Sequence, residues 1–469
     1  MTSQASASGS LPTDGRAMAG NGTSLSNQRI LLAAFFIVTL LPVKPLIGGQ
    51  RMDPERLFLL VAFLPFAIRM LSGRAGRLTM VDAGMVLFNI WLLISFLVNH
   101  GTSQLSYAIS QVLELAGGYM AGRVLVRSVA EYQRFVRYFL ITLAVMLPFG
   151  LIELFTSHML LSEILGKVLP VVQANGAVRY GLTRVQVVFP HAILYGLYCS
   201  IALSSVYFVY RARPFRMWTG LGLVFVTTLM SLSSAPMLSI ILQTGLIVWN
   251  KITRGAWATL AGLFGAAVAI LQLFSNRGPV VFFIETMTLD PQTGWWRIYI
   301  WNWGTFNVMQ HPLFGIGLND WVRPKWMISA SVDNFWLLIA MRNGLPALVF
   351  LLSAVLVHLV LVIRARNLTE AGKDVRLGYA LTLIGLIFLL TTVHVWDEVA
   401  TFVFFFFGIG AFLYTAPAET PDAGDPTVPA KAGTQDRRTL PFTRYPTQRG
   451  SASTRSPDPA PALARKTRP

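Results

Sequence analysis

The stretch 139–152, FLITLAVMLPFGLI, decides the fold class, because it is a long apolar run without a charged side chain. Similar runs recur at 30–40 (ILLAAFFIVTL), 57–68 (LFLLVAFLPFAI) and 378–393 (GYALTLIGLIFLLTTV). In lipid every backbone amide needs a partner within its own structure, and these runs lack the period-2 alternation of a barrel strand. The sequence therefore predicts an all-α, polytopic membrane bundle.

Composition supports the same class of protein. The 469 residues are 54% hydrophobic and 13% charged, whereas a globular average is about 25% charged. The lone cysteine, Cys199, excludes an internal disulfide and a cysteine-based zinc site. The net charge of +17 comes from arginines spread over short loops. We therefore expect no nucleic-acid partner.

Apolar windows long enough to cross about 30 Å of hydrocarbon give about twelve predicted spans. They are 30–46, 57–72, 80–98, 105–122, 136–156, 191–210, 217–233, 236–250, 256–274, 335–362, 377–395 and 399–415. Alternate connections are basic, at 69–77, 123–137, 211–216, 251–254 and 364–376. The positive-inside rule assigns these connections to the cytoplasm. We thus expect a multi-pass protein of the cell inner membrane with both termini cytoplasmic.

Three regions follow from this pattern. Residues 1–28 form a polar, Ser/Gly-rich tail, 29–415 the membrane domain, and 416–469 a Pro/Arg-rich tail; we expect both tails to be disordered and cytoplasmic. Two long connections, about 157–190 and 275–334, lie on the opposite, periplasmic side. The second contains GWWRIYIWNWGTFNVMQHPLFGIGLNDW, whose aromatic residues suit amphipathic helices on the membrane surface.

Three segments resemble one family. RIYIWNWGTFNVMQHPLFGIG begins at Arg297, SVDNFWLLIAMRNGLPALVFLL begins at Ser331, and RVQVVFPHAILYG begins at Arg184. In this order they resemble the O-antigen ligase and polysaccharide polymerase superfamily, with a likeness that runs from about 30 to 415. The resemblance implies an integral membrane glycosyltransferase that moves a glycan from undecaprenyl pyrophosphate to a sugar hydroxyl, on a growing glycan or on lipid A core. It implies no metal and no cofactor.

Guanidinium groups suit the leaving diphosphate, because they grip phosphate oxygens bidentately and stay charged. The resemblance and this chemistry favour Arg184 and Arg297, and Arg179 lies in the same outer connection as Arg184. We expect the fold to bring them together on the periplasmic face, next to the carrier lipid. The alternative is that these arginines snorkel to lipid headgroups or cap helices.

The catalytic base is a separate question. Asp333 stands where the family usually has a His before Asn, so it either accepts the acceptor proton or caps the following helix. His311, in QHPLFG, is a second candidate base, with a structural turn as its alternative. His191 at the mouth of a span, Glu153 and Glu398 are weaker candidates for an acceptor groove. Glu114 lies deepest in its span, and we expect it to pair with an arginine or a polar neighbour on an adjacent helix.

Missing motifs also bear on function. The outer connections contain no Asp-x-Asp and no His-x-x-x-His, so no metal ligands are predicted, and no P-loop is present. The leading interpretation is a polymerase of lipid-linked repeat units for exopolysaccharide, capsule or O-antigen, acting with membrane lipid and other polysaccharide-assembly proteins. The alternatives are an O-antigen ligase to lipid A core, a transporter or flippase of lipid-linked oligosaccharide, and a membrane scaffold.

Overall fold

The computed structural model describes residues 28–47, 50–171, 176–274, 282 and 291–415. The two predicted tails lie outside the described residues, apart from Gln28. In chain order the elements are a short apolar helix Gln28–Thr39, β1 Leu46–Ile47, β2 Gln50–Arg51, α2 Pro54–Leu71, α3 Met80–His100, α4 Leu105–Leu125, α5 Val129–Thr156, α6 Leu160–Leu165, β3 Val178–Arg179, β4 Leu182–Thr183, α7 Ala192–Ser200, α8 Leu203–Tyr210, α9 Pro214–Met230, α10 Ser234–Thr253, α11 Trp257–Phe274, α13 Pro291–Gln310, α14 Phe335–Arg364, α15 Glu370–Leu389, α16 Asp397–Ile409 and α17 Phe412–Thr415. The only sheets among them are two antiparallel hairpins, β1–β2 and β3–β4.

The chain is a helical membrane protein, as predicted. Seven stretches of helix in the described part of the chain are long and apolar enough to cross a membrane. Each of the twelve predicted spans overlaps at least one helix, and the span 191–210 contains both α7 and α8, although the number that cross the bilayer stays a prediction. Some ends differ from the prediction: α15 begins at Glu370 instead of 377, because the Thr369 side chain accepts a hydrogen bond from Gly372 N and caps the helix there.

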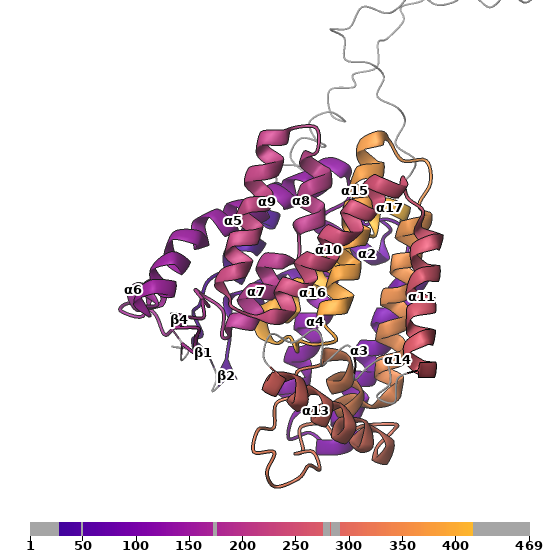
Figure 1. Ribbon diagram of the computed structural model, residues 1–469. Coiled ribbons are helices and arrows are strands. Elements are labelled where there is room, and N and C mark those ends of the chain that lie inside the picture. The colour runs from indigo at the N-terminus through magenta and orange to yellow at the C-terminus, as the bar shows by residue number, and fades with distance from the viewer. Residues whose placement is uncertain (1–27, 48–49, 172–175, 275–281, 283–290, 416–469) are drawn as a thin grey trace, which may run out of the picture. The chain divides into compact units, whose positions relative to one another are not determined.

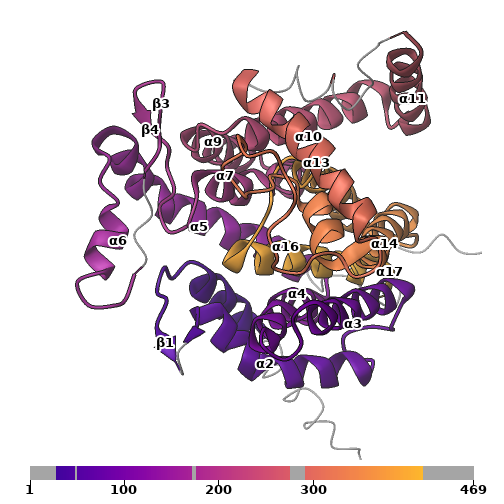
Figure 2. The same ribbon diagram turned by 90° about the horizontal axis from the view of Figure 1, so that it is seen from below.

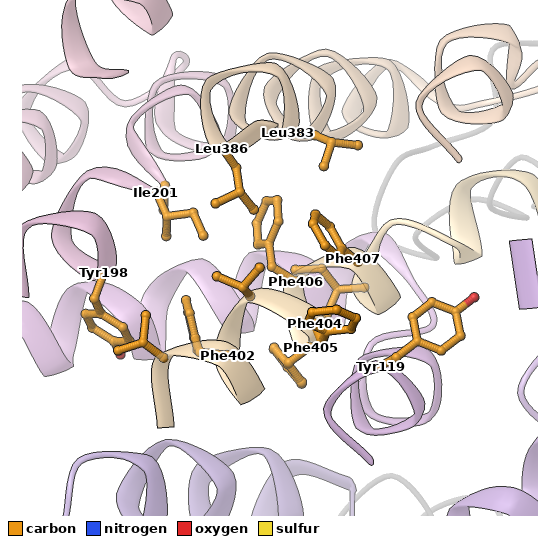
Figure 3. Close-up of a cluster of buried hydrophobic side chains, with 14 of the residues drawn as sticks. Tyr119, Tyr198, Ile201, Leu383, Leu386, Phe402, Phe404, Phe405, Phe406 and Phe407 are labelled. Carbon is orange, nitrogen blue, oxygen red and sulfur yellow. The ribbon is translucent and has the colours of Figure 1, made fainter. Parts of the chain in front are cut away.

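The core is built around α16, whose residues Phe402 to Phe407 are all buried (Figure 3). α4 packs directly against this helix. A Cβ atom on Gly118 would lie 2.5 Å from the Thr401 carbonyl oxygen, and one on Gly122 would lie 2.1 Å from the Phe405 carbonyl oxygen. Only glycines spaced four residues apart let the two backbones approach so closely, which is how helices gain packing energy in lipid.

α11 has the opposite character, since none of its side chains is buried and it lies at the edge of the bundle (Figure 2). Its mean hydropathy of 1.8 would be unfavourable on a surface in water. We therefore infer that the side chains of α11 face lipid.

The predicted basic connections gather at one end of the bundle, here called the basic end. Arg211 Nε lies 2.7 Å from Asp374 Oδ2, which joins the connection after α8 to that before α15. Arg123 donates to the Arg77 carbonyl oxygen at 3.1 Å. The sequence suggested that Arg123 is a loop residue. In the structure it is instead a buried residue in the last turn of α4, where it pairs with Asp82 at 3.1 Å.

The opposite end, here called the loop end, carries α6, the β3–β4 hairpin, α13 and the segment 311–334 (Figure 1). Lys44 N donates to the Pro170 carbonyl oxygen at 2.9 Å, which joins the segment before β1 to the first long predicted connection. Residues 275–281 and 283–290 of the second predicted outer connection lie outside the described residues.

Candidate functional site at the loop end

Arg179 and Arg184 are placed by the β3–β4 hairpin, which folds over the turn between α9 and α10. Arg179 donates to the Leu232 carbonyl oxygen at 2.9 Å. Arg184 donates to Ser233 Oγ at 2.7 Å and to the Ser231 carbonyl oxygen at 3.4 Å. Because a guanidinium carries five N–H donors, these bonds fix both side chains and leave donors for an anion.

Arg297 comes from α13, on a different part of the loop end. Its side chain is half-buried, and its Nε–H is buried without a hydrogen bond to any described residue. A buried, unpaired donor on a charged group is costly and needs a physical explanation, such as a ligand that accepts the bond.

Asp333 and Arg297 interact electrostatically: burial raises the pKa of Asp333, and the charge of Arg297 lowers it by a smaller amount. The alternative role as a helix cap belongs to the next residue. Asn334 is the N-cap of α14, and its side chain accepts a hydrogen bond from Leu337 N at 2.9 Å. The Asp333 carboxylate is therefore available for another role.

The three arginines share one electrostatic environment. Burial lowers the pKa of Arg184, and the charge of Arg179 lowers it further. Burial likewise lowers the pKa of Arg297, which Asp333 raises and Arg179 lowers. Arg179 thus acts on both Arg184 and Arg297, and Asp333 acts on Arg297, so the three cations face one carboxylate and leave an excess of positive charge. Such a cluster, called here the arginine cluster (Arg179, Arg184 and Arg297), favours a multivalent anion.

His191 lies beside this cluster as the N-cap of α7. Its Nδ1 accepts a hydrogen bond from Ile193 N at 3.1 Å. Desolvation and then the charge of Arg184 lower its pKa, so the ring is neutral near pH 7. With Nδ1 accepting, the remaining proton is on Nε2, which makes His191 a hydrogen-bond donor rather than a base.

His311 has a different position. It is exposed at the end of α13, and its backbone N–H donates to Asn307 O at 3.1 Å. Among the described residues no contact joins its ring to Asp333 or to the arginine cluster.

Glu153 is 1% exposed, and its two oxygens accept hydrogen bonds from Gln186 N at 2.9 Å and Val187 N at 2.8 Å. Val187 has a φ of 56°, which a β-branched residue rarely adopts. Glu153 therefore holds the chain that follows Arg184 in this conformation, and its place in an acceptor groove stays a prediction.

Glu398 belongs to a network of ion pairs that the sequence did not reveal. Lys44 Nζ lies 2.7 Å from Asp397 Oδ2, 3.7 Å from Glu398 Oε2 and 3.8 Å from Asp53 Oδ2. Trp396, which directly precedes Asp397, packs against His191 with ring centroids 6.4 Å apart. The network therefore adjoins the arginine cluster.

Arg56 extends this network into the bundle. Its Nη2 lies 3.3 Å from Asp397 Oδ1, and its Nε pairs with Glu114, which is fully buried in α4. Glu114 therefore has an arginine partner on an adjacent helix, as expected from its deep position in the predicted span.

One group of carboxylates among the described residues is close enough to share a cation. Oxygen atoms of Asp53, Glu55 and Glu398 lie within 4.8 Å of one another, and all three side chains are buried. Lys44 already places its ammonium group beside two of them.

His394 also escaped sequence analysis. It lies in the connection before α16, where burial and then the charge of Arg342 lower its pKa to about 3. Its ring contacts Phe335 and Trp396. A neutral histidine between the start of α14 and the start of α16 links the Asp333 side of the site to the ion-pair network.

Comparison with known families agrees with this arrangement. The family model described as O-Antigen ligase matches residues 195–352, about a third of the chain. The resemblance to the O-antigen ligase-like superfamily is thereby confirmed for that segment, which contains Arg297, His311 and Asp333. Arg179 and Arg184 precede it. No curated protein matches the chain closely enough to add to this finding. The match supports a membrane enzyme of the O-antigen ligase or polymerase type, with lipid-linked glycans as its general class of substrate.

Proposed function

We propose that the chain is a metal-independent glycosyltransferase of the inner membrane that polymerises lipid-linked repeat units on the periplasmic face. The donor would be an oligosaccharide on undecaprenyl pyrophosphate, and the product an exopolysaccharide, capsule or O-antigen. The observation that supports this most strongly is the arginine cluster, with its unpaired Arg297 Nε–H and the Asp333 carboxylate beside it.

In the proposed reaction the acceptor hydroxyl oxygen attacks the anomeric carbon of the donor sugar. The bond from this carbon to the diphosphate oxygen breaks, and its electron pair leaves with the diphosphate. Arg184 and Arg297 stabilise the negative charge that develops there. Asp333 takes the proton from the acceptor hydroxyl.

Purified protein with lipid-linked repeat units provides the test, with chain length read on a gel. Removing one donor to a developing anion typically costs about 100- to 1,000-fold in rate. We expect Arg184→Ala and Arg297→Ala each to lose activity on that scale. Arg184→Lys and Arg297→Lys should fall in between, since lysine keeps the charge but not the bidentate geometry.

Arg216→Ala is the matched control, because Arg216 is an exposed arginine at the basic end. It should transfer at the parental rate. Full polymer formation by both Arg184→Ala and Arg297→Ala would rule out a diphosphate clamp. In cells, gene deletion that leaves single repeat units supports a polymerase, whereas long chains left on the carrier lipid would identify a ligase.

A further inference from the structure

A pocket of about 470 Å³ opens at the loop end between α13 and the segment that leads to α14. Its lining includes Trp296, Trp326, Ile328, Ser329, Ser331 and Asp333. Trp326 is 54% exposed and Ile328 is 89% exposed. Asp333 forms part of its wall, so the pocket adjoins the proposed reaction centre.

Aromatic rings form one side of this pocket. The centroids of Trp296 and Trp326 lie 5.9 Å apart with planes at 49°, and Tyr299 meets Trp326 edge-on at 4.9 Å. Because each ring restricts the next, Trp326 keeps a fixed orientation although half of its surface is open to solvent.

The segment across from α13 is also fixed in place. Asn307 is buried on α13, where its Oδ1 accepts from Val322 N at 2.9 Å and its Nδ2 donates to the Val322 carbonyl oxygen at 2.8 Å. Trp321 Nε1 donates to the Ala330 carbonyl oxygen at 3.1 Å. The pocket is therefore formed before any ligand binds, as binding sites usually are.

Polar groups complete the lining. Ser329 Oγ and Ser331 Oγ lie 2.9 Å apart, and Asp333 adds a carboxylate. A pyranose ring has C–H groups on its faces, which pack on aromatic rings, and hydroxyl groups at its edge, which need hydrogen-bond donors and acceptors. An acyl chain would use only the apolar half of this surface.

We propose that this pocket binds sugar residues of the acceptor glycan and directs the reacting hydroxyl toward Asp333. The inference rests on the proposed function and extends it to a glycan subsite. Trp296 and Trp326 hold the sugar ring by stacking, and the serine hydroxyls fix its edge.

Isothermal titration calorimetry of the full-length protein with two probes tests this proposal. The first probe is the free oligosaccharide repeat unit, cut by mild acid from the polysaccharide of the producing cell. The second probe is inorganic pyrophosphate. We expect Trp296→Ala and Trp326→Ala to weaken oligosaccharide binding about tenfold or more and to leave pyrophosphate binding unchanged.

Trp295→Ala is the matched control, because Trp295 lies next to Trp296 on the same helix and is 51% exposed but does not line the pocket. It should bind both probes as the parent does. Trp326→Phe should retain oligosaccharide binding, which separates loss of the stacking ring from misfolding. Arg297→Ala should show the reverse pattern, with pyrophosphate binding lost.

The outcomes that overturn the inference are distinct. If the parent binds pyrophosphate and the two alanine variants bind the oligosaccharide normally, the pocket is not a sugar subsite and the proposed function stands. If the parent binds neither probe, the proposed function fails as well. Brominated lipids in nanodiscs quench the fluorescence of a tryptophan that inserts into the membrane. If this quenching is seen in the parent and disappears in Trp326→Phe, Trp326 contacts lipid, and the pocket binds lipid instead of a sugar.

Discussion

At the scale of single residues, Asp333 predicts a pH dependence. Burial raises its pKa above the ordinary 3.8, and the charge of Arg297 reduces this rise. A base must be ionised to act, so transfer should be complete above this raised pKa and be lost as the pH falls through it. The pH profile of kcat/KM should show an acid limb at a higher pH than that of an exposed aspartate.

Two variants test that assignment. Asp333→Asn should remove the limb together with most of the activity. In Arg297→Gln the opposite charge is gone, so the limb of the residual activity should move to still higher pH. If the acid limb of the Arg297→Gln profile is unchanged, Asp333 is not the group whose titration produces it.

Arg56 and Glu114 predict a strong effect on stability. Glu114 is fully buried in α4, and Arg56 of α2 is its ion-pair partner. Breaking a buried pair by removing one partner typically costs about 3–5 kcal/mol, because the other charge is left uncompensated. Arg56→Met should lower the melting temperature measured by differential scanning fluorimetry.

The double variant Arg56→Met with Glu114→Gln should recover part of this loss, since it no longer leaves the Glu114 carboxylate buried without its partner. Equal melting temperatures for the single and double variants would show that the pair is not coupled.

Sequence reasoning proposed the arginine cluster and Asp333 as site residues but did not single out Lys44 or Arg56. The arginine cluster and Asp333 lie in or beside segments whose order along the chain resembles a known family. The chemistry of each of these side chains also suggests a role without knowledge of its neighbours in space. Lys44 and Asp397 are 353 residues apart, and Arg56 and Asp397 are 341 apart. No local pattern reports pairings over such separations. The only sign of this network in the sequence was Glu114, because a carboxylate deep in a membrane span needs a partner. The sequence could not identify Arg56 as that partner.

At the scale of elements, HPLFGIG docks into a break in α14. Gly344 has φ 83° and ψ 171°, which interrupts the helix. The exposed backbone groups find partners in the motif, since Ile316 N donates to Met341 O at 2.8 Å and Leu345 N to Pro312 O at 2.7 Å. A broken helix in a membrane is tolerated only when its backbone is satisfied in this way.

Gly344→Ala should therefore disrupt this junction. Its Cβ would lie 1.9 Å from the Leu313 carbonyl oxygen, and its φ of 83° disfavours any side chain. We expect a lower melting temperature and faster proteolysis near 311–318. Gly245→Ala in α10 is the control, because its Cβ would meet nothing within 4 Å. There, alanine should be neutral or should stabilise by about 0.5–1 kcal/mol.

The helices themselves were predictable because hydropathy reports burial in lipid directly. Their interruptions were not. α7 and α8 form one predicted span but two helices, and the break in α14 depends on a loop that returns to it from residues 311–317. Such details come from tertiary contacts, for which the period of apolar residues carries no information.

At the scale of the whole molecule, the two ends of the bundle differ in chemistry. The basic end contains the arginine-rich connections, some of them paired, as Arg211 is with Asp374. The loop end carries the arginine cluster and the aromatic pocket. The positive-inside rule assigns short connections rich in arginine and lysine to the cytoplasm. Because these connections lie at the basic end, the rule predicts that the loop end faces the periplasm.

Cysteine accessibility tests this orientation. Cys199 is buried and is the sole native cysteine, so Cys199→Ala provides a background without thiols. Ile328→Cys reports on the loop end, where Ile328 is 89% exposed, and Ala212→Cys reports on the basic end. A membrane-impermeant maleimide should label Ile328→Cys in intact inner-membrane spheroplasts and Ala212→Cys only after permeabilisation. The reverse pattern would place the arginine cluster in the cytosol, away from a diphosphate carrier that presents its glycan outside.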